Sequence, residues 1–396
     1  MTTMTDETDI LLVGGGTAST AAAAEIRKQG FTGTVTMLTR ELDPPYHRPA
    51  VSKELLGADG AQHPIKLVPD EWWDEQQVRL HTRAAVTALD PDGHTVTLAD
   101  KTRLRYGTAL LATGANVRRL QLPGASLSGV HYLRAPGNSA KLRGELDDVE
   151  HAVLVGGSFI ATEVAAALTE RGVQCTMIMP ESGPLINAVG PAVSAHVSCL
   201  LTRHGVRLVC GDQIAEFLGE DRVRQVRTDS GRVEPADLVV VGVGATPDTR
   251  LAAKSGLEIG ASGGVACDAT LRTSAPDLFA AGDVCEYDSL VHGRRLRVEH
   301  DQHAAAQGAT AAHGLLGQAV AHREVPYFWT DISDWVRLEC VGPAGNWDRE
   351  RIDGSLENND FTVWYERDGS VVAALTSNRP HDLATAREIM SMNTRS

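Results

Sequence analysis

The first part of the chain places apolar and small-residue segments in a regular order. An apolar run at residues 9–13 leads into three glycines, an alanine-rich segment at 17–29 and a second apolar run at 34–39. Short apolar runs bounded by turn residues are typical of strands buried on both faces, and the alanine-rich segment is typical of a helix. This order predicts a strand–helix–strand unit with parallel strands.

A second unit follows the same order. Apolar runs at 152–155 and 174–179 flank a helix predicted at 159–171, and a glycine turn again precedes the helix. Each unit is followed by alternating polar and apolar residues, at 82–98 and at 206–233, which predicts antiparallel strands. The chain therefore contains an internal repeat and is predicted to have an α/β fold.

The composition changes near the end of the chain. An alanine-rich helix is predicted within 298–316, and from about residue 324 the sequence becomes rich in aromatic residues. Apolar aromatic runs at 327–329 and 361–365 predict strands, and a closing helix is predicted near 382–390. This tail is expected to form a third, smaller α+β domain.

Composition and charge narrow the class of protein. The 396 residues, 42% of them hydrophobic, suffice for two or three domains with buried cores. The formal net charge of -14 argues against nucleic acid or an anionic membrane as a general partner, because both attract basic surfaces. No run reaches the ~18 apolar residues of a membrane helix, and the polar start at 1–9 lacks signal-peptide features. A cytoplasmic protein is expected.

The cysteine pattern excludes several chemistries. No two cysteines form a C-x-x-C pair, a zinc-like quartet or an evenly spaced disulfide framework. Thiol–disulfide chemistry and a metal site are therefore disfavoured, and most of these thiols are expected to be inert. The six cysteines are Cys175, Cys199, Cys210, Cys267, Cys285 and Cys340.

The first glycine turn has the context of a dinucleotide-binding site. It follows a predicted strand and opens a predicted helix, so backbone N–H groups and the helix dipole face an incoming pyrophosphate. Glu41, just past the second strand, is expected to accept hydrogen bonds from an adenosine ribose. Ser19 is a mild departure from the glycine or alanine of the fingerprint. The residues expected at the turn are Gly14, Gly15, Gly16, Thr17 and Ala18.

Two further turns end apolar strands in small residues. The first is formed by Ala112, Thr113 and Gly114, and the second ends in Asp283. Asp283 is placed to accept a hydrogen bond from a ribityl hydroxyl, although a helix N-cap is the alternative role.

The second glycine turn is expected to hold a nicotinamide nucleotide. Ser158 occupies a fingerprint position that commonly carries glycine. Its side chain is expected to make the approach of the backbone to a pyrophosphate tighter. Glu181 lies where an acid selects the free 2′-hydroxyl of NADH, and no arginine at 179–181 is available for the phosphate of NADPH. NADH is therefore favoured. The turn comprises Gly156, Gly157, Ser158, Phe159 and Ile160.

These motifs together resemble one family. The chain is similar to the FAD-dependent NAD(P)H:ferredoxin reductases of oxygenase and cytochrome P450 systems, the putidaredoxin reductase-like members of the pyridine nucleotide-disulfide oxidoreductase superfamily. Beyond the turns described above, the resemblance rests on 45–53, 156–163, 298–300 and 325–331. It covers nearly the whole chain and is specific for the fold and the cofactor.

The resemblance implies a glutathione-reductase-like architecture. Two Rossmann-type domains would be joined by a C-terminal α+β domain, and the first Rossmann-type domain would be discontinuous. An FAD-binding domain is expected at 1–118 and 246–322, an NAD(P)H-binding domain at 119–245 and a C-terminal reductase domain at 323–396.

The resemblance also implies the roles of several residues. Lys53 and Glu163 would meet beside the flavin N5, where they balance charge and position the nicotinamide. Arg48 would lie near the FAD pyrophosphate or the flavin, and Trp329 would shield the flavin or lie on the electron exit route. A core position is the alternative for Trp329. Further cofactor contacts are expected at Arg134, Gly244, Glu299 and His300.

NADH would thus reduce FAD, and the reduced flavin would pass electrons singly to a [2Fe-2S] ferredoxin. Arg294, Arg295 and Arg297 are candidates for docking an acidic ferredoxin, although a solvated hairpin is the alternative. Asp301 departs from the tryptophan common in the family at that position. Two other functions remain open: direct reduction of a small-molecule acceptor, and an NADH-responsive role similar to that of the apoptosis-inducing-factor relatives. The oligomeric state, monomer or dimer, is left open.

Overall fold

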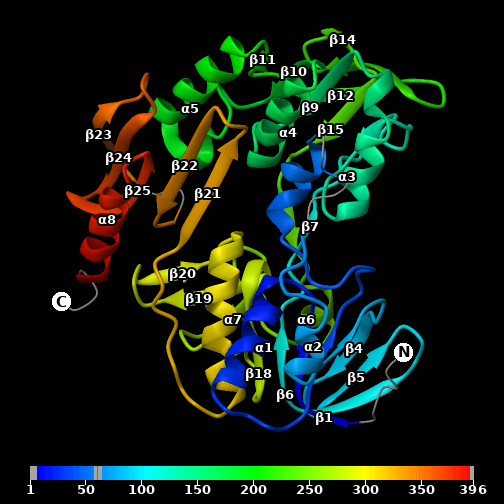
Figure 1. The fold of residues 1–396 in the computed structure, drawn as a ribbon, viewed down its shortest axis with the longest axis vertical. Coiled ribbons are helices and arrows are strands. Elements are labelled where there is room, and N and C mark those ends of the chain that lie inside the picture. The colour runs from blue at the N-terminus through cyan, green and yellow to red at the C-terminus, as the bar shows by residue number, and fades with distance from the viewer. Residues whose placement is uncertain (1–6, 58–59, 61–64, 344, 346, 393–396) are drawn as a thin grey trace.

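The computed structural model describes residues 7–57, 60, 65–343, 345 and 347–392. The first six residues of the polar start lie outside this range. The chain forms three parts, each built on its own sheet, and the parts meet near the middle of the molecule (Figure 1). Among the described residues, no helix has the length and apolar character required to cross a bilayer.

The first part contains a seven-stranded sheet in the order β3-β2-β1-β6-β5-β4, with β18 beside β6. β1, β2, β3, β6 and β18 pair in parallel, whereas β4 and β5 form an antiparallel extension. The strands are β1 (Glu7–Val13), β2 (Val35–Leu38), β3 (Val78–His81), β4 (Val86–Asp90), β5 (Thr95–Leu98), β6 (Arg103–Leu111) and β18 (Leu278–Ala280).

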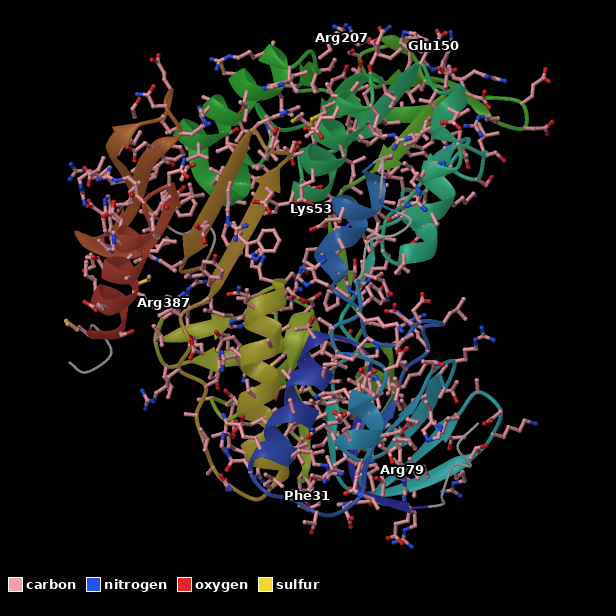
Figure 2. The ribbon with its side chains drawn as sticks, in the orientation of Figure 1. Phe31, Lys53, Arg79, Glu150, Arg207 and Arg387 are labelled. Atoms are coloured by element: carbon pink, nitrogen blue, oxygen red, sulfur yellow. The ribbon has the colours of Figure 1, made fainter. Side chains whose placement is uncertain are left out.

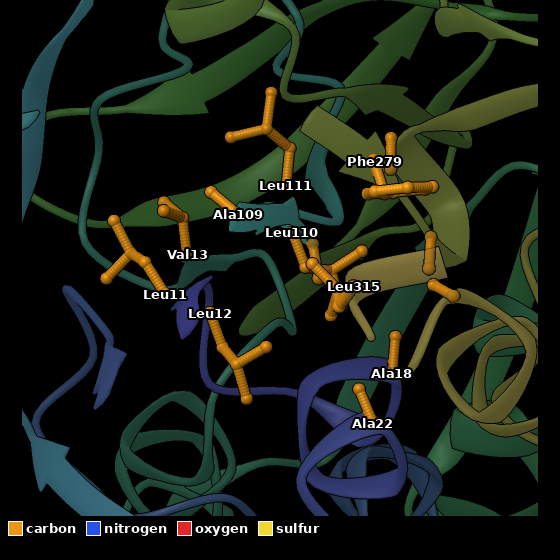
Figure 3. Close-up of a cluster of buried hydrophobic side chains, with 14 of the residues drawn as sticks. Leu11, Leu12, Val13, Ala18, Ala22, Ala109, Leu110, Leu111, Phe279 and Leu315 are labelled. Atoms are coloured by element: carbon orange, nitrogen blue, oxygen red, sulfur yellow. The ribbon is translucent and has the colours of Figure 1, made fainter. Parts of the chain in front are cut away.

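Helices α1 (Thr17–Lys28) and α7 (Asp301–Leu315) pack side by side against this sheet. Their small residues allow close approach, and the apolar side chains of β1, β6 and β18 form the core beneath them. Figure 3 shows part of this core, in which side chains of β1 (Leu11, Leu12), β6 (Leu110) and α1 (Ala18, Ala22) are labelled. The expected strand–helix–strand unit is confirmed, although α7 begins at Asp301 because the backbone before it is extended.

The second part repeats this arrangement with a five-stranded parallel sheet in the order β11-β10-β9-β15-β8. The antiparallel prediction for 206–233 is wrong at its start, because β11 pairs in parallel with β10, with Val209 buried. The elements are β8 (Val130–His131), α3 (Pro136–Arg143), β9 (His151–Val155), α4 (Phe159–Glu170), β10 (Gln174–Met179), α5 (Ile186–Arg203), β11 (Arg207–Cys210), β12 (Ile214–Gly219), β13 (Val223–Thr228), β14 (Val233–Pro235) and β15 (Leu238–Val241).

The third part is an antiparallel sheet in the order β21-β22-β25-β24-β23, covered by α8. It shares a core with the second part, where the hydroxyl of Tyr365 donates a hydrogen bond of 2.6 Å to the carbonyl of Val189. The elements are β21 (Tyr327–Ile332), β22 (Val336–Val341), β23 (Arg349–Ser355), β24 (Asp360–Arg367), β25 (Ser370–Ser377) and α8 (Pro380–Met392).

Short elements complete the chain and join the parts. β7 and β16 pair antiparallel where the chain crosses between the first two parts. The remaining elements are the 3-10 helices Arg48–Ser52, Glu54–Leu56, Leu146–Asp148 and Gly282–Val284, with α2 (Trp72–Glu75), β7 (Ala115–Val117), β16 (Ala245–Pro247), α6 (Arg250–Lys254), β17 (Val265–Cys267), β19 (Cys285–Ser289) and β20 (Arg294–Leu296).

Candidate functional site

A cavity of about 750 Å³ lies where the three parts meet. Lys53, labelled near the middle of Figure 2, lies at this junction. The cavity collects most of the residues singled out in the sequence, although they come from distant segments. These residues are Gly14, Gly15, Gly16, Thr17, Ala18, Glu41, Arg48, Lys53, Ala112, Thr113, Gly114, Arg134, Ser158, Phe159, Ile160, Glu163, Gly244, Asp283, Glu299, His300 and Trp329. Gly156, Gly157 and Glu181 do not line it.

The first glycine turn leaves the start of α1 open to the cavity. Gly14 has a φ of 121°, and a Cβ there would lie 2.0 Å from the carbonyl oxygen of Ala112. Gly16 is the N-cap residue, and a Cβ there would meet nothing within 4 Å. Among the described residues, no side-chain hydrogen bond at the N-cap position closes this helix end. Free N–H groups and the positive end of the helix dipole therefore face the cavity, which suits a pyrophosphate.

Glu41 lines the cavity just beyond β2 and is held by two neighbours. Its carboxylate accepts hydrogen bonds of 2.6 Å from the Tyr46 hydroxyl and 2.9 Å from Nη2 of Arg48. Burial opposes ionisation of Glu41, but the charge of Arg48 and the Tyr46 hydroxyl lower its pKa below the usual value. Glu41 is thus a charged acceptor, partly engaged by Arg48.

Asp283, Arg48 and Arg134 bring opposite charges together at the cavity wall. Nη1 of Arg48 donates a hydrogen bond of 2.8 Å to the backbone oxygen of Arg134. Burial raises the pKa of Asp283, and the positive charge of Arg134 opposes that rise. This mixed-charge wall provides donors for phosphate and an acceptor for hydroxyl groups.

Arg40 and Asp248 also line the cavity and were not singled out in the sequence. Nη1 of Arg40 lies 2.7 Å from the Asp248 carboxylate, and the Asp248 backbone oxygen accepts a bond from the Thr113 hydroxyl. Asp248 follows β16, so only the crossing of the chain back to the first part brings it here. Local sequence gives no signal for this contact.

Lys53 and Glu163 form an ion pair that defines one end of the cavity. Glu163 also accepts hydrogen bonds of 2.6 Å from the hydroxyls of Ser52 and Thr330. The four side chains come from all three parts of the structure, and Glu163 is buried. Ser52 and Thr330 were missed by sequence reasoning, although both lie within segments that carried the family resemblance.

Aromatic side chains wall this end of the cavity. The centre of the Trp329 ring lies close to two cations, 5.0 Å from Nζ of Lys53 and 4.8 Å from the guanidinium carbon of Arg337. His300 stacks on Phe328 with ring centroids 4.4 Å apart. Burial lowers the pKa of His300 to about 4, so the ring is neutral near pH 7.

The second glycine turn lies at the carboxyl end of β9. Gly156 has a φ of 102°, and the Ser158 hydroxyl accepts a hydrogen bond from the N–H of Ala161, capping α4. This cap uses the serine that departs from the fingerprint.

Glu181 lies just beyond β10, near Cys210 at the end of β11. Burial raises the pKa of Cys210, and the negative charge of Glu181 adds to the rise. One carboxylate oxygen of Glu181 is buried without a hydrogen-bond partner among the described residues. Glu181 therefore keeps one acceptor oxygen unused at the end of the strand that neighbours β9.

The three arginines of the predicted docking hairpin differ in their surroundings. Arg294 and Arg295 are exposed, and Arg295 pairs with Asp288 and Glu258. The Arg297 side chain is only 17% exposed and pairs with Glu299 beside the cavity. Arg297 therefore packs behind two residues that line the cavity, Asp283 and Glu299, whereas the other two arginines face solvent.

The chain matches two protein families over adjoining segments. Residues 8–308 match the pyridine nucleotide-disulphide oxidoreductase family, and residues 327–396 match the reductase C-terminal family. The chain belongs to the pyridine nucleotide-disulphide oxidoreductase family and is an oxidoreductase. Membership implies a flavin and a nicotinamide nucleotide as cofactors, in agreement with the two glycine turns.

Two similar proteins are named as reductases. The chain is 36% identical over 392 residues to the ferredoxin reductase subunit of 5,5′-dehydrodivanillate O-demethylase of a Sphingobium species, covering 98% of this chain and 94% of that protein. Rhodocoxin reductase of Rhodococcus erythropolis is 33% identical, with 96% and 89% covered.

Two solved structures have closely similar folds. The ferredoxin reductase of the CYP199A2 system of Rhodopseudomonas palustris superposes with a TM-score of 0.93 and 31% identity, covering 98% of this chain and 95% of that one. The covalent putidaredoxin reductase–putidaredoxin complex gives a TM-score of 0.92 and 28% identity, with 97% and 93% covered. These similarities confirm the predicted family and fold.

Proposed function

We propose that this protein is an FAD-dependent NADH:ferredoxin reductase, which passes electrons from NADH to a [2Fe-2S] ferredoxin serving a cytochrome P450 or Rieske oxygenase. The observation that carries the proposal is the Lys53–Glu163 pair. It links the two strand–helix–strand parts at the cavity into which both open. Relatives named as ferredoxin reductases of oxygenase systems support the same reaction.

FAD would bind to the part formed by 1–118 and 246–322. The uncapped start of α1 supports this assignment, because a pyrophosphate there would receive backbone hydrogen bonds. Arg48 and Arg134 add positive charge, and Asp283 offers an acceptor for a ribityl hydroxyl. Glu41 would accept from the adenosine ribose while Arg48 keeps it ionised.

NADH would bind to the part formed by 119–245. The positive φ of Gly156 and the start of α4 support a second pyrophosphate site. The unpartnered oxygen of Glu181 suits a ribose 2′-hydroxyl donor, whereas its negative charge opposes the 2′-phosphate of NADPH. Residues 323–396 would close the flavin end through Trp329 and Thr330.

Bound FAD supplies two-electron acceptance from NADH and one-electron release to ferredoxin. Glu163, held by Ser52 and Thr330, fixes Lys53 in the cavity and limits its net charge. Trp329 covers this end and reduces access of water, which limits side reactions. These side chains would bind and orient the cofactors. The reaction does not require any of them to form a covalent bond with a substrate or cofactor.

The ferredoxin would approach exposed positive charge on an otherwise acidic protein. Arg294 offers such charge on β20, whereas the charge of neighbouring Arg295 is paired with Asp288 and Glu258. One solved relative is a covalent complex of putidaredoxin reductase with putidaredoxin, which supports a protein partner. Electrostatic attraction of this kind acts mainly on the association rate.

Anaerobic stopped-flow absorbance tests the proposal. Rapid bleaching of the yellow protein by NADH, followed by rapid reoxidation on adding a [2Fe-2S] ferredoxin, is the expected result. Bleaching without reoxidation by ferredoxin would indicate reduction of a small-molecule acceptor. Slow turnover together with NADH-dependent dimerisation would indicate an NADH-responsive protein. No bleaching by NADH or by NADPH would contradict the proposed hydride transfer to the flavin.

A further inference from the structure

The carboxylate of Asp301 joins the starts of two helices at the cavity. Asp301 is the first residue of α7, and its Oδ1 accepts a hydrogen bond from the hydroxyl of Thr17, the first residue of α1. Its Oδ2 lies 3.7 Å from Nδ1 of His47. Asp301 and Thr17 both line the cavity. A carboxylate in the first helical turn is stabilised by the helix dipole.

His47 places Asp301 at the Lys53–Glu163 end of the cavity. The imidazole of His47 lies nearly parallel to the Trp329 ring, with an interplanar angle of 19° and a centroid distance of 6.4 Å. Trp329 in turn contacts Lys53. A continuous series of contacts therefore runs from the Asp301 carboxylate to the ion pair that defines this end.

The two carboxylates at the Lys53–Glu163 end, Glu163 and Asp301, differ in the cation that lies beside them. Lys53 is neutralised by Glu163. Within residues 7–57, 60, 65–343, 345 and 347–392, the one cationic type of side chain within 4 Å of the Asp301 carboxylate is His47, which is 39% exposed. Asp301 therefore contributes negative charge that no lysine or arginine offsets at contact distance.

We propose that the negative charge of Asp301, held in place by its neighbours, makes bound FAD harder to reduce. The inference rests on the proposed binding of FAD in this cavity. Reduction adds electrons to the flavin, and a nearby fixed carboxylate opposes that gain. The cavity wall screens this repulsion less than open solvent does. Thr17 and His47 hold the carboxylate in place, so the effect depends on both its charge and its position.

The direct test is the midpoint potential of the FAD-loaded protein, measured by anaerobic equilibration with a redox dye. Asp301→Asn keeps the size of the side chain and removes its charge. We expect the equilibrium to shift at least tenfold toward the reduced form, which is ~30 mV for a two-electron couple. Asp301→Glu retains the charge and is expected to remain closer to the wild-type value.

A second variant tests the same charge from the opposite side. His47→Arg places a permanent cation opposite the carboxylate and is also expected to raise the potential. It keeps the test decisive if Asp301→Asn does not fold, since Asp301 itself is unchanged.

Glu25→Gln is the matched control. Glu25 of α1 lies 3.7 Å from a ring nitrogen of His313 of α7, so it repeats the carboxylate–histidine contact between the same helices at their other ends. Its potential is expected to equal that of the wild type. An unchanged or lower potential in Asp301→Asn and His47→Arg would overturn the proposal. Failure of the wild type to bind FAD would instead contradict the proposed function.

Discussion

Lys53 and Glu163 are 110 residues apart in the sequence, yet they form an ion pair between two separate parts of the protein. The Lys53 and Glu163 side chains are only 13% and 6% exposed. Because both are removed from bulk water, each depends on the other for charge compensation. The pair therefore couples the packing of the parts to the chemistry of the cavity.

Lys53→Met is expected to slow bleaching by NADH by at least about tenfold, because Glu163 loses its partner and the nicotinamide end loses its cation. It is also expected to reduce the free energy of unfolding by about 3 kcal/mol, the usual cost of leaving a buried charge unpaired. Stopped-flow absorbance and urea unfolding measure the two effects. The double variant Lys53→Met with Glu163→Gln is expected to recover part of the stability but not the rate. Recovery of both would contradict a functional role for the pair.

Gly16→Ala is expected to weaken FAD binding by at least about tenfold while changing the free energy of unfolding of the apoprotein by less than about 1 kcal/mol. A methyl group at Gly16 meets no protein atom, so it obstructs only a ligand at the start of α1. Fluorescence titration of apoprotein with FAD measures the affinity. Gly14→Ala is the contrasting variant, because its methyl group would collide with the Ala112 carbonyl and is expected to destabilise the protein itself. Equal FAD affinity in Gly16→Ala and wild type would argue against a pyrophosphate at this turn.

Glu181→Arg is expected to shift nucleotide preference from NADH toward NADPH. The change removes an acceptor for the 2′-hydroxyl and adds a cation for the 2′-phosphate, so the ratio of kcat/KM values should change by at least about tenfold. Glu181→Gln separates the two contributions, since it removes the charge and retains an acceptor oxygen. A preference that stays the same in both variants would show that the selecting group lies elsewhere.

Arg294→Glu is expected to lower the rate of ferredoxin reduction at low salt by several-fold and to leave bleaching by NADH unchanged. Arg294 is exposed on β20, so reversal of its charge acts on the encounter with an acidic partner. The difference from wild type is expected to shrink as the salt concentration rises. Arg105→Glu is the matched control, because Arg105 is equally exposed on β6 but lies toward the strand end remote from the cavity. An equal loss in both variants would indicate a general charge effect instead of docking.

Acid is expected to destabilise the protein between about pH 6.5 and pH 4 through its buried histidines. Burial lowers the pKa of His322 to about 4 and lowers that of His303 well below the usual value. Both bind protons more readily in the unfolded chain, where the pKa is about 6.5, so stability is present above pH 6.5 and falls as the pH decreases. Urea unfolding across this range measures the loss, expected to be about 2 kcal/mol for His322.

His322→Gln is the variant that isolates this contribution. Its stability is expected to depend less on pH than that of the wild type over the same window, because glutamine does not titrate. Most other titrating groups are common to both proteins, so the difference between the two curves reports His322 together with its effect on the neighbouring His303, whose pKa the charge of His322 lowers. Parallel curves would contradict the assignment.

Sequence periodicity was sufficient to predict both strand–helix–strand units, because each depends on neighbouring residues. Buried parallel strands such as 174–179 need continuous apolar residues, and a helix entered through a glycine turn needs small residues at its start. The antiparallel prediction failed at β11, whose alternating residues fit either pairing direction. Only the position of β10 beside it determined the parallel one.

Some features of the site could be predicted from the sequence, and others depend on contacts between distant segments. The sequence by itself determined the two glycine turns, Glu41 and the family to which the chain belongs, because local spacing specifies a strand, a turn and a helix start. Only the tertiary structure decided that Ser52 and Thr330 hold Glu163, that Asp248 meets Arg40 and that Asp301 bridges Thr17 and His47. Those contacts join segments that are far apart in the chain. Hydrogen bonds between distant segments produce no periodic pattern of residues, so the sequence alone does not predict them.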